Sequence, residues 1–252
     1  MEIQEIIEFR NEHWRPGWGS TSAPEMHYIT SVLERLAPQN IAEIGVASGI
    51  TSAIICMEMK RLGLQSTFYA LDYSETFFGD KSKKVGYIME SIEKGDTDYK
   101  LLLKKTTLDL YDMAPSLALD FVFIDANHQH PWPTLDTIAV LPHMRTGAKS
   151  VIVHHDLRLF ANSALGIGPK VLMDQFPESD KESGTREGNI GSILVTQPPA
   201  AYESHLADAL LLPWNVKQRI PFTALVRFRR LIAEHYSATL LKAFDSAAER
   251  YY

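Results

Sequence analysis

The sequence has 252 residues, a net charge of −6 and a single cysteine, Cys56. Its length fits one large domain, or one domain with an appendage. The acidic balance argues against binding to nucleic acid or to an anionic membrane, and a lone thiol excludes an internal disulfide and a cysteine-based zinc site.

The chain starts with a segment that predicts a short amphipathic helix over residues 1–12. Its first residues are acidic and lack the basic and then apolar layout of a signal peptide, and no apolar run approaches the ~20 residues that span a bilayer. We therefore expect a soluble, cytoplasmic protein. The stretch 13–24, HWRPGWGSTSAP, predicts a loop because it is rich in Gly, Pro and Ser. Its tryptophans either anchor the loop to the body or form a lid over a site.

Helices and strands then alternate from residue 24 to residue 156. Apolar residues at helical spacing predict helices, and short continuous apolar runs predict strands. The predicted helices are 24–36, 50–63, 84–95 and 134–144, and the predicted strands are 40–46, 66–73, 99–106, 119–126 and 149–156. This pattern is typical of an α/β fold with a doubly wound, mostly parallel sheet that is covered on both faces.

The last part of the chain departs from this alternation. Residues 157–187 predict a helix followed by a long loop, and residues 190–196 predict one more strand. From residue 200 the pattern is helical, with a long helical stretch over 221–252. We expect three parts: an N-terminal helix with a possible lid (1–23), a central domain (24–199) and a helical extension that is not an independent domain (200–252). The apolar surface of that extension also predicts a homodimer.

A glycine-containing turn follows the first predicted strand. In EIGVASG, Gly45 and Gly49 permit positive φ and a close approach of the backbone to a ligand. Asp72 ends the second predicted strand, where a carboxylate suits the two hydroxyls of a ribose. The turn lacks the middle glycine of the dinucleotide pattern G-x-G-x-x-G. Without Asp72, an ordinary tight turn explains the glycines equally well.

Two further acids, Asp125 and Asp156, each end a predicted strand, so four polar groups share one edge of the sheet. Asp125 belongs to FIDANHQHPWP, where His128 and His130 follow it. A cation held by such acids lowers the pKa of a hydroxyl, and an imidazole can take the proton near neutral pH. Asp125 could instead cap the following helix, and we expect His130 to be a surface histidine.

The motifs AEIGVASG, YALDYSE, DFVFIDANHQH and SVIVHHD together resemble class I S-adenosylmethionine-dependent methyltransferases. The last two resemble the metal-dependent O-methyltransferase branch, which includes catechol O-methyltransferase-like and natural-product sugar O-methyltransferases. The resemblance spans residues 24–196 and implies a seven-stranded, Rossmann-like methyltransferase fold that binds S-adenosylmethionine. The predicted cofactor-binding residues are Glu43, Gly45, Ser48, Gly49, Asp72, Tyr73 and Asp125.

The same resemblance implies a divalent cation held by Asp125, His155 and Asp156, with His128 as the general base. His154 and His155 alternate along a strand, so only one of them can face the site. The expected ion is Mg²⁺ or Mn²⁺, and an imidazole ligand moves the preference away from Mg²⁺ toward manganese, iron, zinc or nickel.

The predicted function is O-methylation of a small hydroxylated acceptor, either phenolic or a glycosylated natural product. Three alternatives remain open at this point. They are a Rossmann-type oxidoreductase with a nucleotide cofactor, a metal-dependent hydrolase built on the His and Asp residues, and a non-catalytic binding protein that uses the C-terminal helices.

Overall fold

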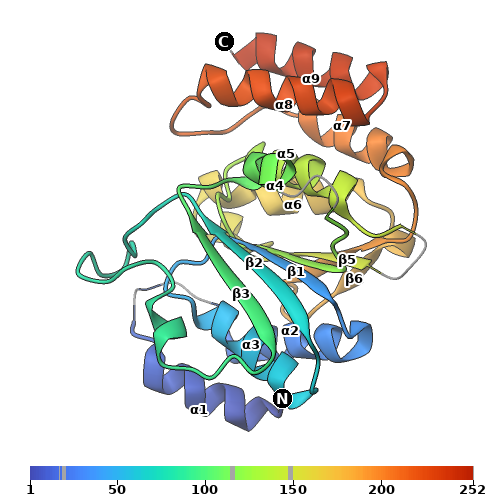
Figure 1. Cartoon of the computed structure of the whole chain (residues 1–252). Coiled ribbons are helices and arrows are strands. Elements are labelled where there is room, and N and C mark those ends of the chain that lie inside the picture. The colour runs from blue at the N-terminus through green and yellow to red at the C-terminus, as the bar shows by residue number, and fades with distance from the viewer. Residues whose placement is uncertain (17, 19–20, 114–116, 147–149, 252) are drawn as a thin grey trace.

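A single seven-stranded sheet forms the centre of the protein, as seen in a computed structural model (Figure 1). The structure describes residues 1–16, 18, 21–113, 117–146 and 150–251. The strand order is β3-β2-β1-β4-β5-β7-β6, with β1 to β5 parallel and β6 and β7 antiparallel. The strands are β1 (Asn40–Ile44), β2 (Ser66–Asp72), β3 (Thr97–Leu103), β4 (Phe121–Ile124), β5 (Ser150–His154), β6 (Lys181–Ser183) and β7 (Gly191–Val195). The prediction of a mostly parallel, doubly wound sheet is confirmed.

The strands at the centre of the sheet are buried on both faces. Every residue of β4 and of β5 is buried, which explains why their sequences read as continuous apolar runs. Successive side chains point to opposite faces, so Phe123 joins one apolar core and its neighbours Val122 and Ile124 join the other.

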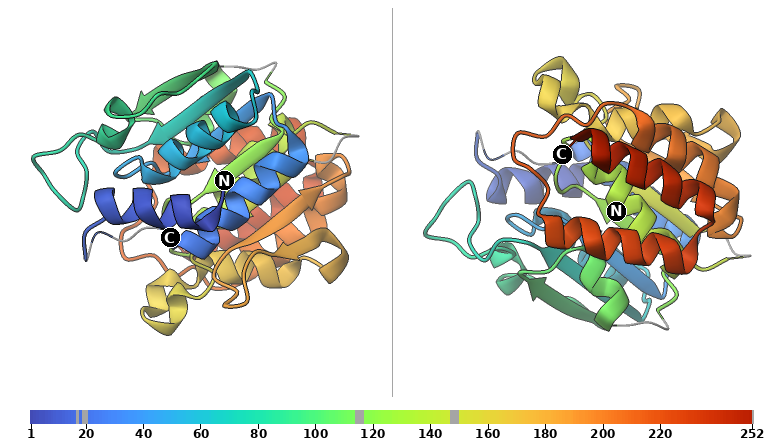
Figure 2. Two further views of the ribbon diagram at one scale, coloured as in Figure 1. Left: turned by 90° about the horizontal axis from the view of Figure 1, so that it is seen from below. Right: turned by 90° about the horizontal axis from the view of Figure 1, so that it is seen from above.

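Helices cover the sheet in layers (Figures 1 and 2). Helices α1 to α3 lie on one face and α4 to α6 on the other, and α7 to α9 form an outer layer over α5 and α6. The helices are α1 (Ile3–His13), α2 (Ala23–Leu36), α3 (Ile50–Arg61), α4 (Thr107–Met113), α5 (Trp132–Val140), α6 (Gly168–Gln175), α7 (Glu203–Leu211), α8 (Phe222–His235) and α9 (Ala238–Tyr251). Within the described residues, no helix has the length and apolar character needed to cross a bilayer.

The three C-terminal helices share the core of the central sheet. The Tyr202 hydroxyl accepts from the backbone N–H groups of Thr196 and Gln197, and lies 3.1 Å from the Leu194 carbonyl oxygen at the end of β7. The Tyr236 hydroxyl donates to a carbonyl oxygen of α5. The extension is therefore fastened to the sheet by the buried Tyr202 and to α5 by the partly buried Tyr236. It is also two helices rather than one after residue 221, because the chain breaks between α8 and α9.

The helix predicted over 84–95 is wrong. Only a 3-10 turn, Tyr87–Glu90, forms there. The backbone of this segment bonds to the glycine loop instead of to itself: the Gly86 N–H donates to the Ala47 carbonyl and the Ile88 N–H to the Ser48 carbonyl. Those bonds use N–H groups that a longer helix would need, and they seat the segment beside the loop.

Two short elements were not predicted. Helix α4 has only seven residues, and its start is capped by Asp109, which accepts from the Thr106 N–H at 2.8 Å. Strand β6 falls within the long loop predicted before residue 188 and has three residues, which pair antiparallel with β7. The predicted fifth strand begins at Lys149, which lies outside the described residues, as does Gly147 before it.

Candidate cofactor and metal site

The site lies where the strand order reverses, between β1 and β4, the usual place for a ligand in such a sheet. Gly45 follows β1 and Asp125 follows β4. The Gly45 N–H donates to the Leu71 carbonyl and the Asp125 N–H to the Ile44 carbonyl, so both residues continue the strand register. Gly45 has φ +94°, and a Cβ there would lie 2.2 Å from the Asp125 carbonyl oxygen. The glycine thus lets the turn after β1 touch the end of β4.

The glycine loop is held from the side by Asp72. One oxygen of this carboxylate accepts from the N–H groups of Val46 and Ala47, each at 3.0 Å. Its other oxygen accepts from the Ser74 N–H at 2.7 Å. Asp72 thus holds the backbone of the glycine loop in place. That this carboxylate also binds the cofactor stays a prediction. Tyr73, beside it, is 79% exposed.

Two predicted cofactor residues of this region are buried. Glu43 lies behind the loop and is 1% exposed; one oxygen accepts from the Ser52 hydroxyl of α3, and the other makes no hydrogen bond among the described residues. Burial raises the pKa of Glu43 well above its usual value, which favours the neutral acid. Ser48 is 8% exposed, and its carbonyl accepts from Ile88. Gly49, with φ +88°, is the N-cap residue that precedes α3.

Four titratable side chains meet beside the loop. The Nε2 atom of His128 lies 3.0 Å from Asp125 Oδ1 and 3.3 Å from Asp156 Oδ2. The Nδ1 atom of His155 lies 3.1 Å from Asp125 Oδ1 and 3.6 Å from Asp156 Oδ1. The structure therefore brings together Asp125, His128, His155 and Asp156, which lie on two separate segments of the sequence. Asp156 adopts φ +59°, a left-handed conformation that is uncommon among non-glycine residues but is adopted by aspartate more often than by most.

The electrostatics of this cluster follow from opposite charges in a partly buried place. Burial raises the pKa of Asp125, but the charge of His155 and the hydrogen bond from His128 outweigh burial, so the pKa lies below the usual range. Burial lowers the pKa of His128, yet the contacts with Asp125 and the charge of Asp156 leave it above 6.5. In the protein alone, the imidazoles supply the positive charge between these carboxylates.

The structure decides which histidine of the pair faces the site. His155 faces the acids, and His154 faces the opposite core, where its Nε2 atom lies 3.0 Å from the Thr137 hydroxyl of α5. Burial lowers the pKa of His154 to about 3, so it is neutral. The expectation that His130 is a surface residue is wrong: it is 1% exposed, and burial lowers its pKa to about 4.

Two polar residues of the site were missed. Glu25 of α2 and Asn189, which precedes β7, lie behind His155 and Asp156. Burial raises the pKa of Glu25, but contacts with His155, Ser22 and Asn189 lower it to about 2. The sequence carried one signal for Glu25, the capping-box pattern that begins at Ser22. That pattern indicates the start of a helix and not its distance from a strand end.

The donor set fits a divalent cation. One ligand atom each of Asp125, His128 and Asp156 lie within 4.8 Å of one another. The Nδ1 atom of His155 is buried beside them, 3.1 Å from Asp125 Oδ1 and 3.6 Å from Asp156 Oδ1. Carboxylate oxygens combined with imidazole nitrogens suit manganese, iron, nickel or zinc better than an all-oxygen site would.

The N-terminal loop lies against the segment that follows β2. Trp18 packs edge-on against Phe77 and Tyr87, with ring centroids 5.2 and 6.4 Å apart. Gly17, Gly19 and Ser20 of the predicted lid lie outside the described residues. Trp18 thus joins two chain segments that are far apart in the sequence.

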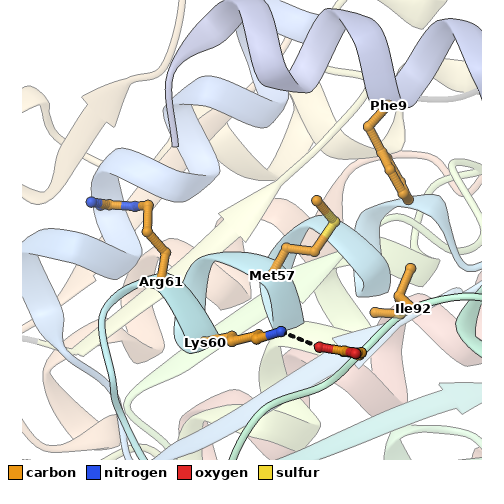
Figure 3. Close-up of a pocket in the computed structure, with 6 residues that line it drawn as sticks. Phe9, Met57, Lys60, Arg61 and Ile92 are labelled. Atoms are coloured by element: carbon orange, nitrogen blue, oxygen red, sulfur yellow. Dashed lines mark hydrogen bonds and ion pairs between the residues drawn. The ribbon is translucent and has the colours of Figure 1, made fainter.

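A cavity of about 460 Å³ lies elsewhere, between α1 and α3 (Figure 3). It is lined by Phe9, Met57, Lys60, Arg61, Ile92 and Glu93. Its α3 residues belong to the last turns of that helix, and an ion pair between Lys60 and Glu93 crosses it. Because Gly49 lies at the other end of α3, the cavity is remote from the acidic and imidazole cluster.

Comparisons with known proteins agree with this geometry. Residues 42–157, which contain the glycine loop, Asp72 and the four-residue cluster, match the methyltransferase domain family. No curated protein matches the chain. Among solved structures, the O-methyltransferase TomG from Streptomyces achromogenes, involved in tomaymycin synthesis and solved with S-adenosylmethionine, is 19% identical, with a TM-score of 0.52 over 77% of this chain and 89% of TomG. An O-methyltransferase from Bacillus cereus, solved with S-adenosylhomocysteine, is 16% identical, with a TM-score of 0.50 over 76% of this chain and 90% of that one.

At these identities the likeness to the solved structures is one of fold. The segment that matches the family contains the glycine loop and the cluster of acids and imidazoles. Three observations agree on a methyltransferase fold: the family match, the strand order, and the glycine loop at the point where that order reverses. Residues 42–157 thus match a methyltransferase domain, and the chain has the fold of O-methyltransferases that were solved with S-adenosylmethionine or S-adenosylhomocysteine.

Proposed function

We propose that the protein is an S-adenosylmethionine-dependent methyltransferase, that it transfers the methyl group to a hydroxyl oxygen of a small acceptor, and that a divalent cation takes part. The observation that carries the proposal is the contact between Gly45 and Asp125, which sets the cofactor loop directly beside the cluster of acids and imidazoles. The solved structures with a similar fold include O-methyltransferases, which supports transfer to oxygen.

In this proposal Asp125, His155 and Asp156 hold the cation. A bound cation lowers the pKa of an acceptor hydroxyl and fixes the position of its oxygen. His128 accepts the hydroxyl proton on Nε2, and Asp125, 3.0 Å away, stabilises the imidazolium that results. Asp72 and the loop that starts at Gly45 orient the cofactor, so that the acceptor and the methyl donor share one edge of the sheet.

The first experiment is calorimetric titration of the purified protein with S-adenosylhomocysteine. We expect micromolar binding that is lost or strongly weakened in Asp72→Ala and Glu43→Ala. Asp98→Ala, at the far end of the neighbouring strand, is the matched control and should bind as the wild type does. An absence of binding by the wild type contradicts the cofactor assignment, and tight binding of a nicotinamide cofactor in its place would favour the oxidoreductase alternative.

A second experiment tests the cation. EDTA should abolish methyl transfer to phenols, catechols or glycosylated phenols, detected by mass spectrometry, and Mg²⁺ or Mn²⁺ should restore it. Binding of S-adenosylhomocysteine should survive EDTA. Methyl transfer that is unaffected by EDTA contradicts the role of the cation.

His128 needs its own variant, because its Nε2 atom also lies within reach of a shared ion. If His128 is the base, the substitution His128→Ala should abolish turnover and leave the affinity for Mn²⁺ within about threefold of wild type. A much larger loss of Mn²⁺ affinity would make His128 a ligand.

We further propose a homodimer and a cytoplasmic location. Phe222 and Val226, one turn apart on α8, are 71% and 49% exposed, which supports a second copy on this face. Light scattering of wild type and of Phe222→Ser plus Val226→Ser tests the dimer, and a monomeric wild-type mass contradicts it. Cys56 is buried and free, which suits a reducing compartment.

A further inference from the structure

A third carboxylate lies behind the predicted metal ligands. Glu25 is 5% exposed and belongs to the first turn of α2, outside the segment that matches the methyltransferase family. Its Oε2 atom accepts from the Ser22 N–H at 2.6 Å and lies 3.3 Å from His155 Nε2. Its Oε1 atom accepts from the Asn189 side-chain amide at 2.8 Å. Burying a carboxylate is costly unless its oxygens are paired, and here both are.

The two nitrogens of His155 have different neighbours. Nε2 faces Glu25, while Nδ1 is directed to the space between Asp125 and Asp156, 3.1 and 3.6 Å from their nearest oxygens. The Asn189 amide is 3.5 Å from Nε2, but its two hydrogens have nearer acceptors in Glu25 and in Asp156, at 2.8 and 3.3 Å. Glu25 is therefore the acceptor that can hold a proton on Nε2.

A histidine that binds a metal through one nitrogen donates the other N–H to a carboxylate, a carbonyl or water. This second contact fixes the tautomer and the ring orientation, and its loss typically costs 10–100-fold in metal affinity. The chain Glu25–His155–cation site has this arrangement: Nε2 faces Glu25, and Nδ1, which gives up its proton when a cation binds, faces the space between Asp125 and Asp156.

We propose that Glu25 is a positioning residue for the cation site: it holds the proton of His155 on Nε2 and thereby directs Nδ1 to a cation between Asp125 and Asp156. Asn189 extends the arrangement, because the same amide joins the Glu25 carboxylate to the Asp156 carboxylate. The inference rests on the proposed function, since it requires that the cation site exist.

The proposal gives α2 a task besides covering the sheet. The capping box that starts this helix and the orientation of His155 use the same carboxylate oxygen. The start of the helix and the geometry of the cation site are therefore set together. Glu5 has the same capping role at the start of α1 but is exposed. Substituting Glu5 therefore measures the effect of losing a helix-capping carboxylate alone.

The test is calorimetric titration of the full-length protein with Mn²⁺, without acceptor, on the wild type, Glu25→Ala, Glu25→Gln and the control Glu5→Ala. We expect Glu25→Ala to weaken Mn²⁺ binding by about 10-fold or more. Glu25→Gln keeps one side-chain oxygen that can accept a hydrogen bond, so its loss of Mn²⁺ affinity should be intermediate. Glu5→Ala should stay within about twofold of wild type. Thermal melting of each variant checks the fold, and Glu25→Gln serves if Glu25→Ala does not fold.

A double-mutant cycle with His155→Ala separates positioning from simple attraction of the cation. If Glu25 acts through the imidazole, Glu25→Ala should change Mn²⁺ affinity by less than about twofold in the His155→Ala protein. The same loss in both backgrounds overturns the proposal, as does unchanged affinity of both Glu25 variants. Pulsed electron paramagnetic resonance of bound Mn²⁺ gives a second readout: coupling to the His155 nitrogen should weaken in Glu25→Ala.

The two levels of proposal fail differently. A wild-type protein that binds S-adenosylhomocysteine but no divalent cation contradicts the cation role, and the positioning role of Glu25 with it. A wild-type protein that binds Mn²⁺ with an affinity independent of Glu25 contradicts the positioning role alone.

Discussion

The backbone of Gly45 lies directly on the carbonyl of Asp125, with no room for even one methyl group between them. The contact joins the glycine loop to Asp125, the first residue of the cluster along the chain. Gly45→Ala places a Cβ at φ +94° and within 2.2 Å of the Asp125 oxygen, so the loop or β4 must move. We expect a loss of roughly 2–5 kcal/mol in the free energy of unfolding, and loss of S-adenosylhomocysteine binding.

The matched control for Gly45 is Gly63, which has φ +64° and no atom within 4 Å of the place that a Cβ would occupy. Gly63→Ala should cost only about 1–2 kcal/mol and leave cofactor binding unchanged. Urea unfolding and calorimetry measure both quantities. Equal effects of the two substitutions would show that conformational strain alone, and not the contact with Asp125, explains the glycine.

Glu43 is expected to act as a neutral acid, because burial raises its pKa well above the usual value. Glu43→Gln keeps the shape of the side chain, but the new side chain cannot ionise. We therefore expect cofactor affinity within about threefold of wild type and equal or higher stability at pH 8. Glu43→Ala, which leaves a cavity and an unpaired Ser52 hydroxyl, should behave far worse in the same titration and melting experiments. A loss of binding in Glu43→Gln as large as in Glu43→Ala would mean that the charged form is needed.

Asp136 of α5 predicts a defined dependence of stability on pH. It is buried, the Thr107 hydroxyl donates to it at 2.7 Å, and burial raises its pKa to about 7. Since the unfolded value is about 3.9, the folded state keeps a proton that the unfolded state releases. The contribution of Asp136 to the free energy of unfolding is fully present below pH ~4. It falls as pH rises and is lost above about pH 7, and the total loss is on the order of 4 kcal/mol at most.

Asp136→Asn should therefore be more stable than the wild type at pH 8, and the difference should shrink toward pH 4.5. Chemical unfolding of both proteins across that range measures the difference and cancels the contributions of other acids. The exposed Asp208→Asn is the control and should follow the wild type. A difference that does not change with pH would contradict the raised pKa.

The linker between α7 and α8 fastens the loop that carries His128. The Lys217 N–H donates to the Gln129 side-chain oxygen at 2.5 Å, and the Asn215 N–H donates to the His130 carbonyl at 2.8 Å. In Gln129→Ala the Lys217 amide loses its acceptor, so we expect its hydrogen exchange to accelerate roughly 5–10-fold. Gln129→Glu keeps an acceptor and should exchange slowly. Exchange measured by NMR that is equal in both variants would show that the contact does not persist in solution.

The sequence predicted the parts of the fold whose stability comes from one strong local pattern. The runs of β4 and β5 are apolar at every position because both faces are covered, and they were recognised as strands. Helix α4 and strand β6 are too short for such a pattern and depend on partners elsewhere in the chain. The segment 84–95 has helical spacing, but bonds to Ala47 and Ser48 override it.

The same limit applies to the site. Strand ends gave Asp125 and Asp156, since parallel strands end at one edge of a sheet. The choice between His154 and His155 needed the register against β4, where His154 pairs with Ile124. Glu25 could not be assigned from the sequence, because only the packed structure brings the start of α2 to β5.

Glu25 and Asn189 are hydrogen-bonded across 164 residues of chain. A contact of this span forms only after the intervening strands have assembled, because the entropy of closing so large a loop must first be offset by the sheet. A refolding chain should thus regain its parallel core before His155 is oriented. The recovery of cation affinity during refolding would then trail the recovery of secondary structure, and it would report the moment at which α2 docks beside the strands β5 and β7.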